Sequence, residues 1–295
     1  MSGPNREASA GLSSRNNDPE TAALPPGIKA GLEAVYARYH HRVFVHPDPL
    51  ELLYHYEDPL DREITGMITS SLAFGRVSQI LKSAGTVMAR LGKPRAFLEQ
   101  TTHRQLEKTC AGFRHRFVTE RELFELLWAM KIVTEQWGSL EALFCNNYRE
   151  HHTSVLPALE AFVRTLRKVC TADANYLLPI PERGSACKRL HLFLRWMVRC
   201  DAVDPGGWPA VPASRLICPV DTHMHRIGRA LGFTSRKQAD GRCALELTQA
   251  LRGADPADPV RFDFALTRLG IRQEGGVHQL LRAFGMESSA VGEVL

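Results

Sequence analysis

Apolar residues recur at spacings of three and four along nearly every segment of this chain, and this pattern most narrows its possible folds. Such spacing places apolar side chains on one face of an α-helix, whereas a strand would show strict alternation. Long alternating runs of β-branched residues are missing, and no internal repeat is found. The sequence therefore predicts an all-α protein. The clearest expected helices cover residues 63–74, 77–91, 122–137 and 156–169.

The expected helix boundaries carry local signals. Thr119 and Glu122 have the spacing of a capping box before an apolar run. Gly92, Gly138 and Gly232 each follow a periodic stretch, where a glycine commonly ends a helix. These signals agree with the periodicity and indicate many short helices.

Two stretches depart from the helical pattern. Residues 1–25 are rich in small and polar residues without an apolar period, which predicts a disordered tail. Residues 201–219 hold four prolines and two glycines and predict a long connection between two helices. Loops of this length inside compact domains are often functional.

Composition excludes several classes of protein. No apolar run is long enough to cross a membrane, and the N-terminus has no apolar core of a secretory signal. The seven cysteines lie at least thirteen residues apart, so neither a structural zinc nor an iron–sulfur cluster is expected. Scattered cysteines in a chain of this size are typical of reduced thiols, which predicts a cytoplasmic protein. The net charge of +5 permits a nucleic-acid partner without requiring one.

The positive charge is concentrated between residues 183 and 237, where ten Lys/Arg accompany three Asp/Glu. A helix is expected to begin near Ser185, with Lys188, Arg195 and Arg199 on the face opposite its apolar stripe. This face is either simply solvated or in contact with nucleic-acid phosphates. The turn at Gly184 and Ser185 would place backbone amides and the positive helix end near such a phosphate.

A second helix is expected to begin at or just after Asp221. Asp221 precedes its apolar face by one turn, so it is either an N-cap or a functional carboxylate. Asp221 and His225 have a spacing that could share a metal, whereas His223 points elsewhere. No further ligand is evident, so no metal site is expected.

Three segments together resemble a known superfamily. They are GSACKRLHLFLRWMVR, CPVDTHMHRIGRALG and DPVRFDFALTRLG, and the stretch DREITGMITSSLAF adds a looser match. They resemble the helix-hairpin-helix DNA glycosylase superfamily, in which the Val-Asp-Thr-His motif carries the catalytic aspartate. They are most similar to a bacterial family of conserved hypothetical proteins within it. The resemblance covers most of residues 27–272.

The resemblance implies two helical lobes with a cleft between them. Residues 60–184 would form the middle lobe, and residues 26–59 plus 185–295 would form the other. Duplex DNA would lie across the cleft, with one phosphate at Gly184 and Ser185 and the target base flipped inward. Asp221 would stabilise the sugar cation as the N-glycosidic bond breaks.

The resemblance also implies a set of nucleic-acid contacts. This sequence departs from the superfamily in several respects. Bifunctional members place a nucleophilic lysine near Ala186. Lys188 is the candidate catalytic residue that could replace it, but it lies about 200° further round a helix, which favours a water-using mechanism or no lyase step. No cysteine follows Cys243, so the iron–sulfur loop of many members is absent and no cofactor is expected. Trp208 is either a packing plug or a base contact. The candidate contacts are Gly184, Ser185, Lys188, Arg189, Arg195, Arg199, His223 and Trp208.

Other functions stay open on the sequence. The scaffold could bind DNA or structured RNA without cleaving it, in which case Asp221 matters only for stability. Asp221 and His225 could belong to a metal-dependent hydrolase. The chain could also be an unrelated helical interaction protein, although no obligate protein partner is evident.

Overall fold

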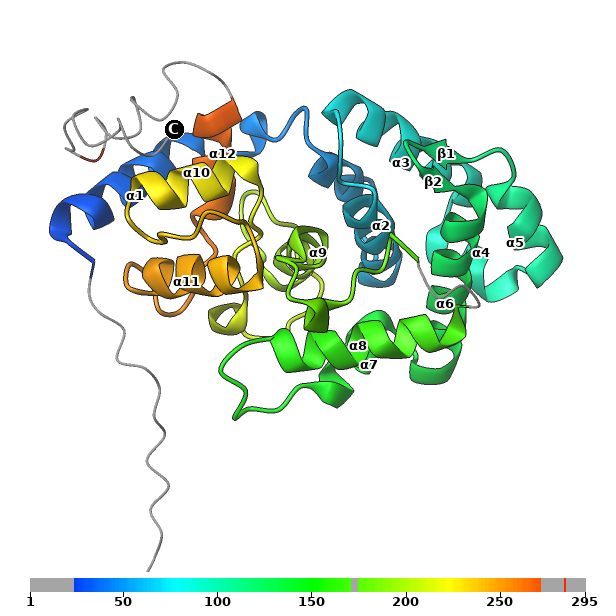
Figure 1. Cartoon of the computed structure of the whole chain (residues 1–295). Helices are drawn as coiled ribbons and strands as arrows, with labels where there is room; N and C mark the ends of the chain where they lie inside the picture. Colours follow the sequence, from blue (N-terminus) through cyan, green and yellow to red (C-terminus); the bar gives the residue numbers. More distant parts are fainter. Residues whose placement is uncertain (1–23, 171–174, 272–283, 285–295) are drawn as a thin grey trace, which may run out of the picture.

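The computed structural model describes residues 24–170, 175–271 and 284, and within them the protein is almost entirely helical (Figure 1). The predicted all-α class is confirmed. The predicted disordered tail falls almost wholly outside the described residues. No helix of the described part combines the length and apolarity needed to cross a membrane. The helices are α1 (Pro26–Tyr39), α2 (Pro59–Ser71), α3 (Val77–Leu91), α4 (Pro94–Gln100), α5 (His103–Cys110), α6 (Glu120–Trp137), α7 (Leu140–Asn147), α8 (Leu156–Val169), α9 (Lys188–Val198), α10 (Thr222–Ala230), α11 (Gly241–Arg252) and α12 (Asp263–Ile271).

Two short strands interrupt the helices. Strands β1 (Arg114–His115) and β2 (Val118–Thr119) pair antiparallel and form a hairpin between α5 and α6. Short 3₁₀ turns lie at Arg42–Phe44, Pro49–His55, Pro181–Arg183 and Ala213–Arg215.

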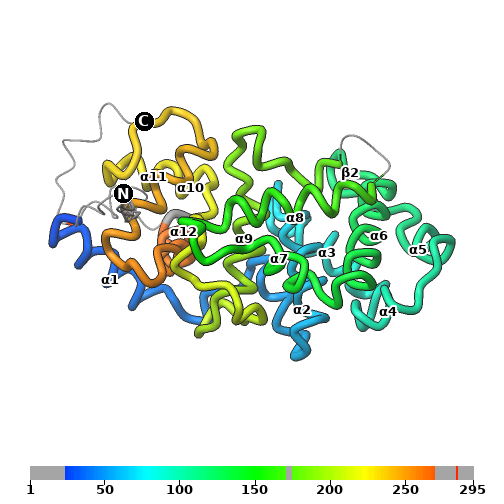
Figure 2. The backbone as a smooth tube through the Cα atoms, turned by 90° about the horizontal axis from the view of Figure 1, so that it is seen from below, coloured from blue at the N-terminus to red at the C-terminus, as the bar shows by residue number. Residues whose placement is uncertain are grey.

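Helix α9 lies near the centre of the molecule (Figures 1 and 2). It packs against α2, while α1 and α10 both pack against α12 on one side. Helix α6 packs against α4, α5, α7 and α8 on the other side. The N-terminal helix α1 and the C-terminal helix α12 are therefore neighbours in space, although they are far apart in the sequence.

Local signals set several helix ends. Thr119 and Glu122 form both hydrogen bonds of the predicted capping box at the start of α6. Gly92 ends α3 with φ of 65°, and Gly138 ends α6 with φ of 85°. Both glycines adopt the left-handed backbone that a side chain disfavours, so these predicted boundaries are confirmed.

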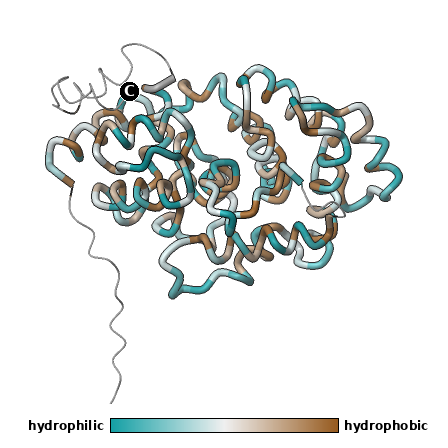
Figure 3. Tube along the Cα trace, viewed as in Figure 1, coloured by the Kyte–Doolittle hydropathy of each residue, from teal (hydrophilic) through white to brown (hydrophobic). Residues whose placement is uncertain are grey.

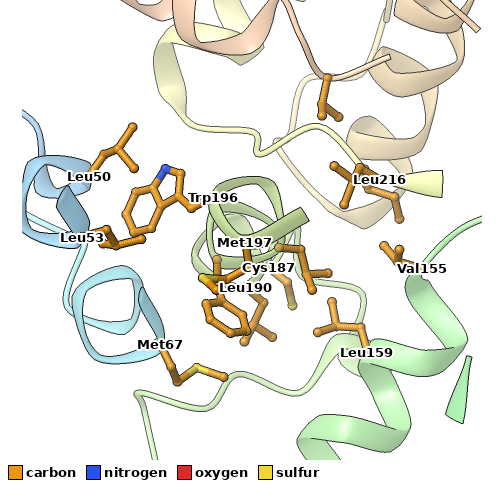
Figure 4. Packing of buried hydrophobic residues seen from close by; sticks show 14 of the residues in the cluster. Leu50, Leu53, Met67, Val155, Leu159, Cys187, Leu190, Trp196, Met197 and Leu216 are labelled. Carbon is orange, nitrogen blue, oxygen red and sulfur yellow. The ribbon is translucent and has the colours of Figure 1, made fainter. Parts of the chain in front are cut away.

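The core surrounds α9, as Figure 4 shows. Of the apolar stripe predicted for this helix, Leu190, Phe193, Leu194 and Met197 are buried and Val198 is half-buried. Trp196 is buried as well. In Figure 3 the hydrophobic residues gather along the central helices, while hydrophilic residues dominate the outer turns. Because α9 is covered on nearly every side, some of its polar side chains are buried too.

His191 is such a residue. It is fully buried on α9, and its Nδ1 has no hydrogen-bond partner in the described structure. Burial lowers the pKa of His191 to about 4 from an ordinary value of 6.5. The folded protein therefore holds this imidazole neutral over a range in which the unfolded chain would protonate it.

We expect this histidine to make the protein less stable in acid. A lowered pKa in the folded state contributes stability that is complete above pH 6.5 and is lost as the pH falls toward 4. Between these values the wild type should lose about 3 kcal/mol more unfolding free energy than His191→Leu, measured by urea unfolding at each pH. Parallel pH profiles for the two proteins would contradict the prediction.

Candidate functional site

A cleft of about 740 Å³ opens where α9, α10 and α12 approach the connection between α2 and α3. Its walls come from residues 46–49, 73–80, 188–196, 219–223 and 263–268, with Ala239 at one edge. The segments are far apart in sequence, so the cleft exists only in the folded chain. Asp221, Lys188 and His223 all lie on its walls.

Asp221 is the N-cap of α10. Its Oδ1 accepts a hydrogen bond from the amide of Met224 at 2.8 Å, which confirms the capping prediction. Its Oδ2 lies 3.4 Å from Nζ of Lys188. The Asp221 side chain is 19% exposed. One oxygen thus holds the helix start, while the other faces a cation at the cleft.

Lys188 is the first residue of α9, and this corrects the helix start predicted at Ser185. Cys187 has a left-handed backbone with φ of 44°, so residues 185–187 are not helical. The amide of Gly241 donates to the carbonyl of Gly184 at 2.8 Å, which pairs this stretch with the start of α11. The rotation of about 200° expected on a continuous helix therefore does not apply. Lys188 can lie beside Asp221 for this reason.

Gly184 and Ser185 are exposed at the turn before α9. The amide of Gly184 donates to the carbonyl of Pro181 at 2.9 Å, so it is already used within the turn. The Ser185 hydroxyl accepts from the amide of Cys187 at 3.3 Å. A phosphate site at this turn stays a prediction, and the Gly184 amide already has a hydrogen-bond acceptor in the turn.

The prediction that Arg195 and Arg199 lie on an exposed basic face of α9 is wrong. Each arginine is only 4% exposed, and both bind carboxylates in the interior. The acids come from the loop after α9, from the segment before α12 and from the first residue of α12. The periodicity of α9 itself cannot indicate partners so far away in the sequence. Arg195 pairs with Asp204 and Asp263, and Arg199 pairs with Asp201, Asp204 and Asp258.

Arg189 is also held by the protein itself. Its guanidinium donates to the carbonyl oxygens of Ser71 and Tyr176, both at 2.6 Å. The same guanidinium lies 4.4 Å from the centre of the Tyr176 ring. Arg189 therefore connects α9 to the end of α2 and to the segment before α9. Its guanidinium also makes a cation–π contact with Tyr176.

Among the described residues, the structure brings no third ligand to a metal site at Asp221 and His225. Nε2 of His225 lies 2.9 Å from the carbonyl oxygen of Arg236. Across the residues that the structure describes, no three His, Cys, Asp or Glu side chains are grouped to hold a metal ion. His223, by contrast, is half-buried on the cleft wall beside Asp221.

Trp208 is a packing plug, and the alternative of a base contact is wrong for this structure. The side chain is 1% exposed, and its ring lies edge-on to Phe193 with centroids 5.0 Å apart. Its Nε1 donates to Glu63 at 3.0 Å. Glu63 also accepts from the amides of Leu140 and Glu141, and burial raises the pKa of Glu63 to about 7. Trp208 thus anchors the long Pro/Gly loop to α2 and α7.

The sequence did not indicate the charged side chains at the base of the cleft. Asp263 and the Asp48–Arg268 ion pair line it, and burial raises the pKa of Asp263 to about 6. Asp48 and Arg268 are 220 residues apart, so no local pattern could have linked them.

Cys218 is the thiol nearest to the charged side chains of the cleft and is a poor candidate nucleophile. All seven cysteines are free, and burial raises the pKa of the Cys218 thiol beside Asp263 well above its usual value. A buried thiol with a raised pKa is a poor nucleophile.

Comparison with known proteins gives one match. No curated protein and no solved structure matches the chain. A family model described as "Protein of unknown function (DUF2400)" matches residues 48–272. The matched span contains both Lys188 and Asp221 and nearly all of the cleft. Since it covers more than half of the sequence, the chain belongs to the DUF2400 family.

Proposed function

We propose that this protein is a DNA N-glycosylase with a helix-hairpin-helix glycosylase-like fold, and that Asp221 is its catalytic carboxylate. One observation carries the proposal: the Oδ2 atom of Asp221 lies 3.4 Å from Nζ of Lys188 on the wall of a cleft of about 740 Å³. A cleft of this volume is large enough for a small organic group such as a base. Lys188, four residues after Gly184, and the motif residues Val220–His223 line this cleft, which supports the proposal.

Asp221 supplies the negative charge that the reaction needs. When the N-glycosidic bond breaks, the base leaves with the bonding electrons and positive charge develops at C1′ of the sugar. A fixed carboxylate stabilises that charge. In the hydrolytic reaction a water oxygen then bonds to C1′, and its proton passes to the carboxylate.

Lys188 supplies a second nucleophile. Its amine can bond to C1′ in place of water, after its proton has passed to a base such as the nearby Asp221 carboxylate. The sugar ring then opens and the C1′–N bond becomes an iminium. The position of Lys188 at the start of α9 supports this lyase step, which the sequence alone made doubtful.

The proposal is tested with oligonucleotides that carry a panel of damaged bases, in single strands and duplexes. We expect the wild type to release at least one base and to form a covalent adduct in the presence of borohydride, which reduces the iminium. Lys188→Gln should form no adduct. Lys237→Gln, a change of an exposed lysine elsewhere in the basic region, should form it as the wild type does.

Other results would change the assignment. Base release without an adduct would leave a glycosylase that uses water alone. No release from any substrate, together with salt-sensitive binding that all variants retain, would favour the alternative of a DNA or structured-RNA binding protein.

A further inference from the structure

Two large aromatic side chains are exposed and touch each other beside the cleft. Phe117 is 51% exposed and Tyr176 is 44% exposed. Their ring centroids are 4.4 Å apart, and the rings are nearly perpendicular. Single exposed apolar residues are ordinary on a protein surface, whereas rings that gather in one exposed patch mark binding surfaces. The patch is therefore a candidate binding surface for a partner that favours aromatic contact.

The protein holds these rings in place. Phe117 lies in the two-residue turn between β1 and β2. His115 in β1 is buried, and its ring nitrogens contact the Ser83 hydroxyl at 2.9 Å and the Phe74 carbonyl oxygen at 3.1 Å. These contacts hold the hairpin against α3 and against the connection that precedes it, so Phe117 lies on a supported turn.

Glu122 joins the two segments that carry the rings. Its carboxylate accepts from the amide of Thr119 at 3.0 Å and from the amide of Tyr176 at 3.4 Å. The patch is thus assembled before any partner arrives, which lowers the entropy cost of binding.

Cationic groups border the same rings. The guanidinium of Arg189 lies 4.4 Å from the Tyr176 ring centre. The guanidinium of Arg116 lies 6.0 Å from the Phe117 ring centre and 5.9 Å from that of Phe74. Arg116 is exposed, so its charge is also available to a phosphate.

Phe74 connects the patch to the cleft. Its ring stacks on Phe117 with centroids 5.4 Å apart and planes 29° apart. Phe74 also lines the cleft that holds Asp221. A chain bound at the cleft could therefore continue onto Phe117 and Tyr176 without leaving the protein surface.

We propose that Phe117 and Tyr176 form a stacking site for an unpaired nucleobase of a single-stranded or locally opened nucleic acid. Exposed rings bordered by guanidinium groups are the chemistry that binds single strands, because every base offers a π face and every nucleotide a phosphate. A base within a duplex is stacked between its neighbours and presents no free face to these rings. The inference rests on the proposed function for its partner class, and it adds that the protein selects unpaired bases.

The test measures binding of a short fluorescein-labelled oligothymidylate by fluorescence anisotropy. Phe117→Leu keeps an apolar side chain and removes the aromatic face, and we expect it to weaken binding about tenfold, as loss of one stacked base does. Phe117→Tyr should bind as the wild type does. Binding of a fully paired, undamaged duplex should be unchanged in both variants.

Trp137→Leu is the matched control. Trp137 is 38% exposed at the far end of α6, about 25 Å along this helix from the hairpin. The Trp137→Leu variant should bind the oligothymidylate with wild-type affinity, which would exclude a general effect of losing a surface aromatic residue.

Three results would overturn the stacking site. They are equal affinity of Phe117→Leu and the wild type, equal weakening for single strand and duplex, and no binding of the single strand by the wild type. The probe carries no damaged base, so binding does not depend on catalysis. If the rings bind the single strand but no base is released, only the proposed glycosylase activity is contradicted. If a base is released and Phe117→Leu binds the oligothymidylate as the wild type does, only the stacking site is contradicted.

Discussion

Asp221→Asn is expected to lower the rate of base release by about 10²–10³-fold while the protein stays folded. Asparagine has nearly the same shape but no charge, so it cannot stabilise the cation that develops at C1′. Its side-chain oxygen can still accept from the amide of Met224, and asparagine is as good an N-cap as aspartate. The lost contact with Lys188 is partly exposed and contributes little stability. The measurement is single-turnover base release, with circular dichroism to confirm the helical content.

The chain supplies a close control in Asp240→Asn. Asp240 caps α11 as Asp221 caps α10, accepting from the amide of Cys243 at 2.8 Å with nearly the same backbone angles. The Asp240→Asn variant should release the base at the wild-type rate. If Asp221→Asn is folded and equally active, Asp221 is only a helix cap and the proposed mechanism fails.

Arg195→Met is expected to lower the free energy of unfolding by about 3–5 kcal/mol. The substitution removes the cation between Asp204 and Asp263, whose side chains are 1% and 3% exposed. Both carboxylates would then be buried without this partner, which is far more costly than losing an exposed pair. Urea unfolding at neutral pH measures the effect.

The pH dependence of this loss gives a second test. Burial already raises the pKa of Asp263 to about 6, and removing Arg195 would raise it further. The unpaired carboxylate can escape its penalty by taking up a proton, so the deficit should be full at pH 8 and smaller at pH 5. Arg226→Met, on the exposed side of α10, should change stability by no more than about 0.5 kcal/mol.

A different result would restore the sequence-based role of Arg195. If Arg195→Met kept wild-type stability, bound DNA more weakly and showed a smaller salt dependence of binding, the arginine would be a phosphate contact.

The helices were largely predictable because their signals are local. The capping box at Thr119 and Glu122, and the glycines that end α3 and α6, act within a few residues of the boundaries that they set. The exception at Ser185 has a clear cause. Residues 184–185 pair with residues 240–241, so a tertiary contact replaced the first helical turn expected there.

The candidate site was predictable only in part. Asp221 was found because an aspartate one turn before an apolar helix face is visible in the sequence. The sequence could not show that Lys188 lies beside it, because the position of Lys188 depends on the left-handed backbone of Cys187. The patch at Phe117 and Tyr176 was missed, since two residues 59 positions apart share no local pattern.

The sequence by itself determined the helical class, most helix boundaries and the carboxylate at the start of α10, because periodicity and capping involve neighbours along the chain. Only the tertiary structure decided which cations face the cleft. Lys188 at the start of α9 is partly exposed at the cleft. Arg195 and Arg199 are buried and paired with carboxylates from the loop after the helix, from the segment before α12 and from the first residue of α12. The physical reason is that a buried charge must have a partner, and that partner is chosen by the packing of distant segments.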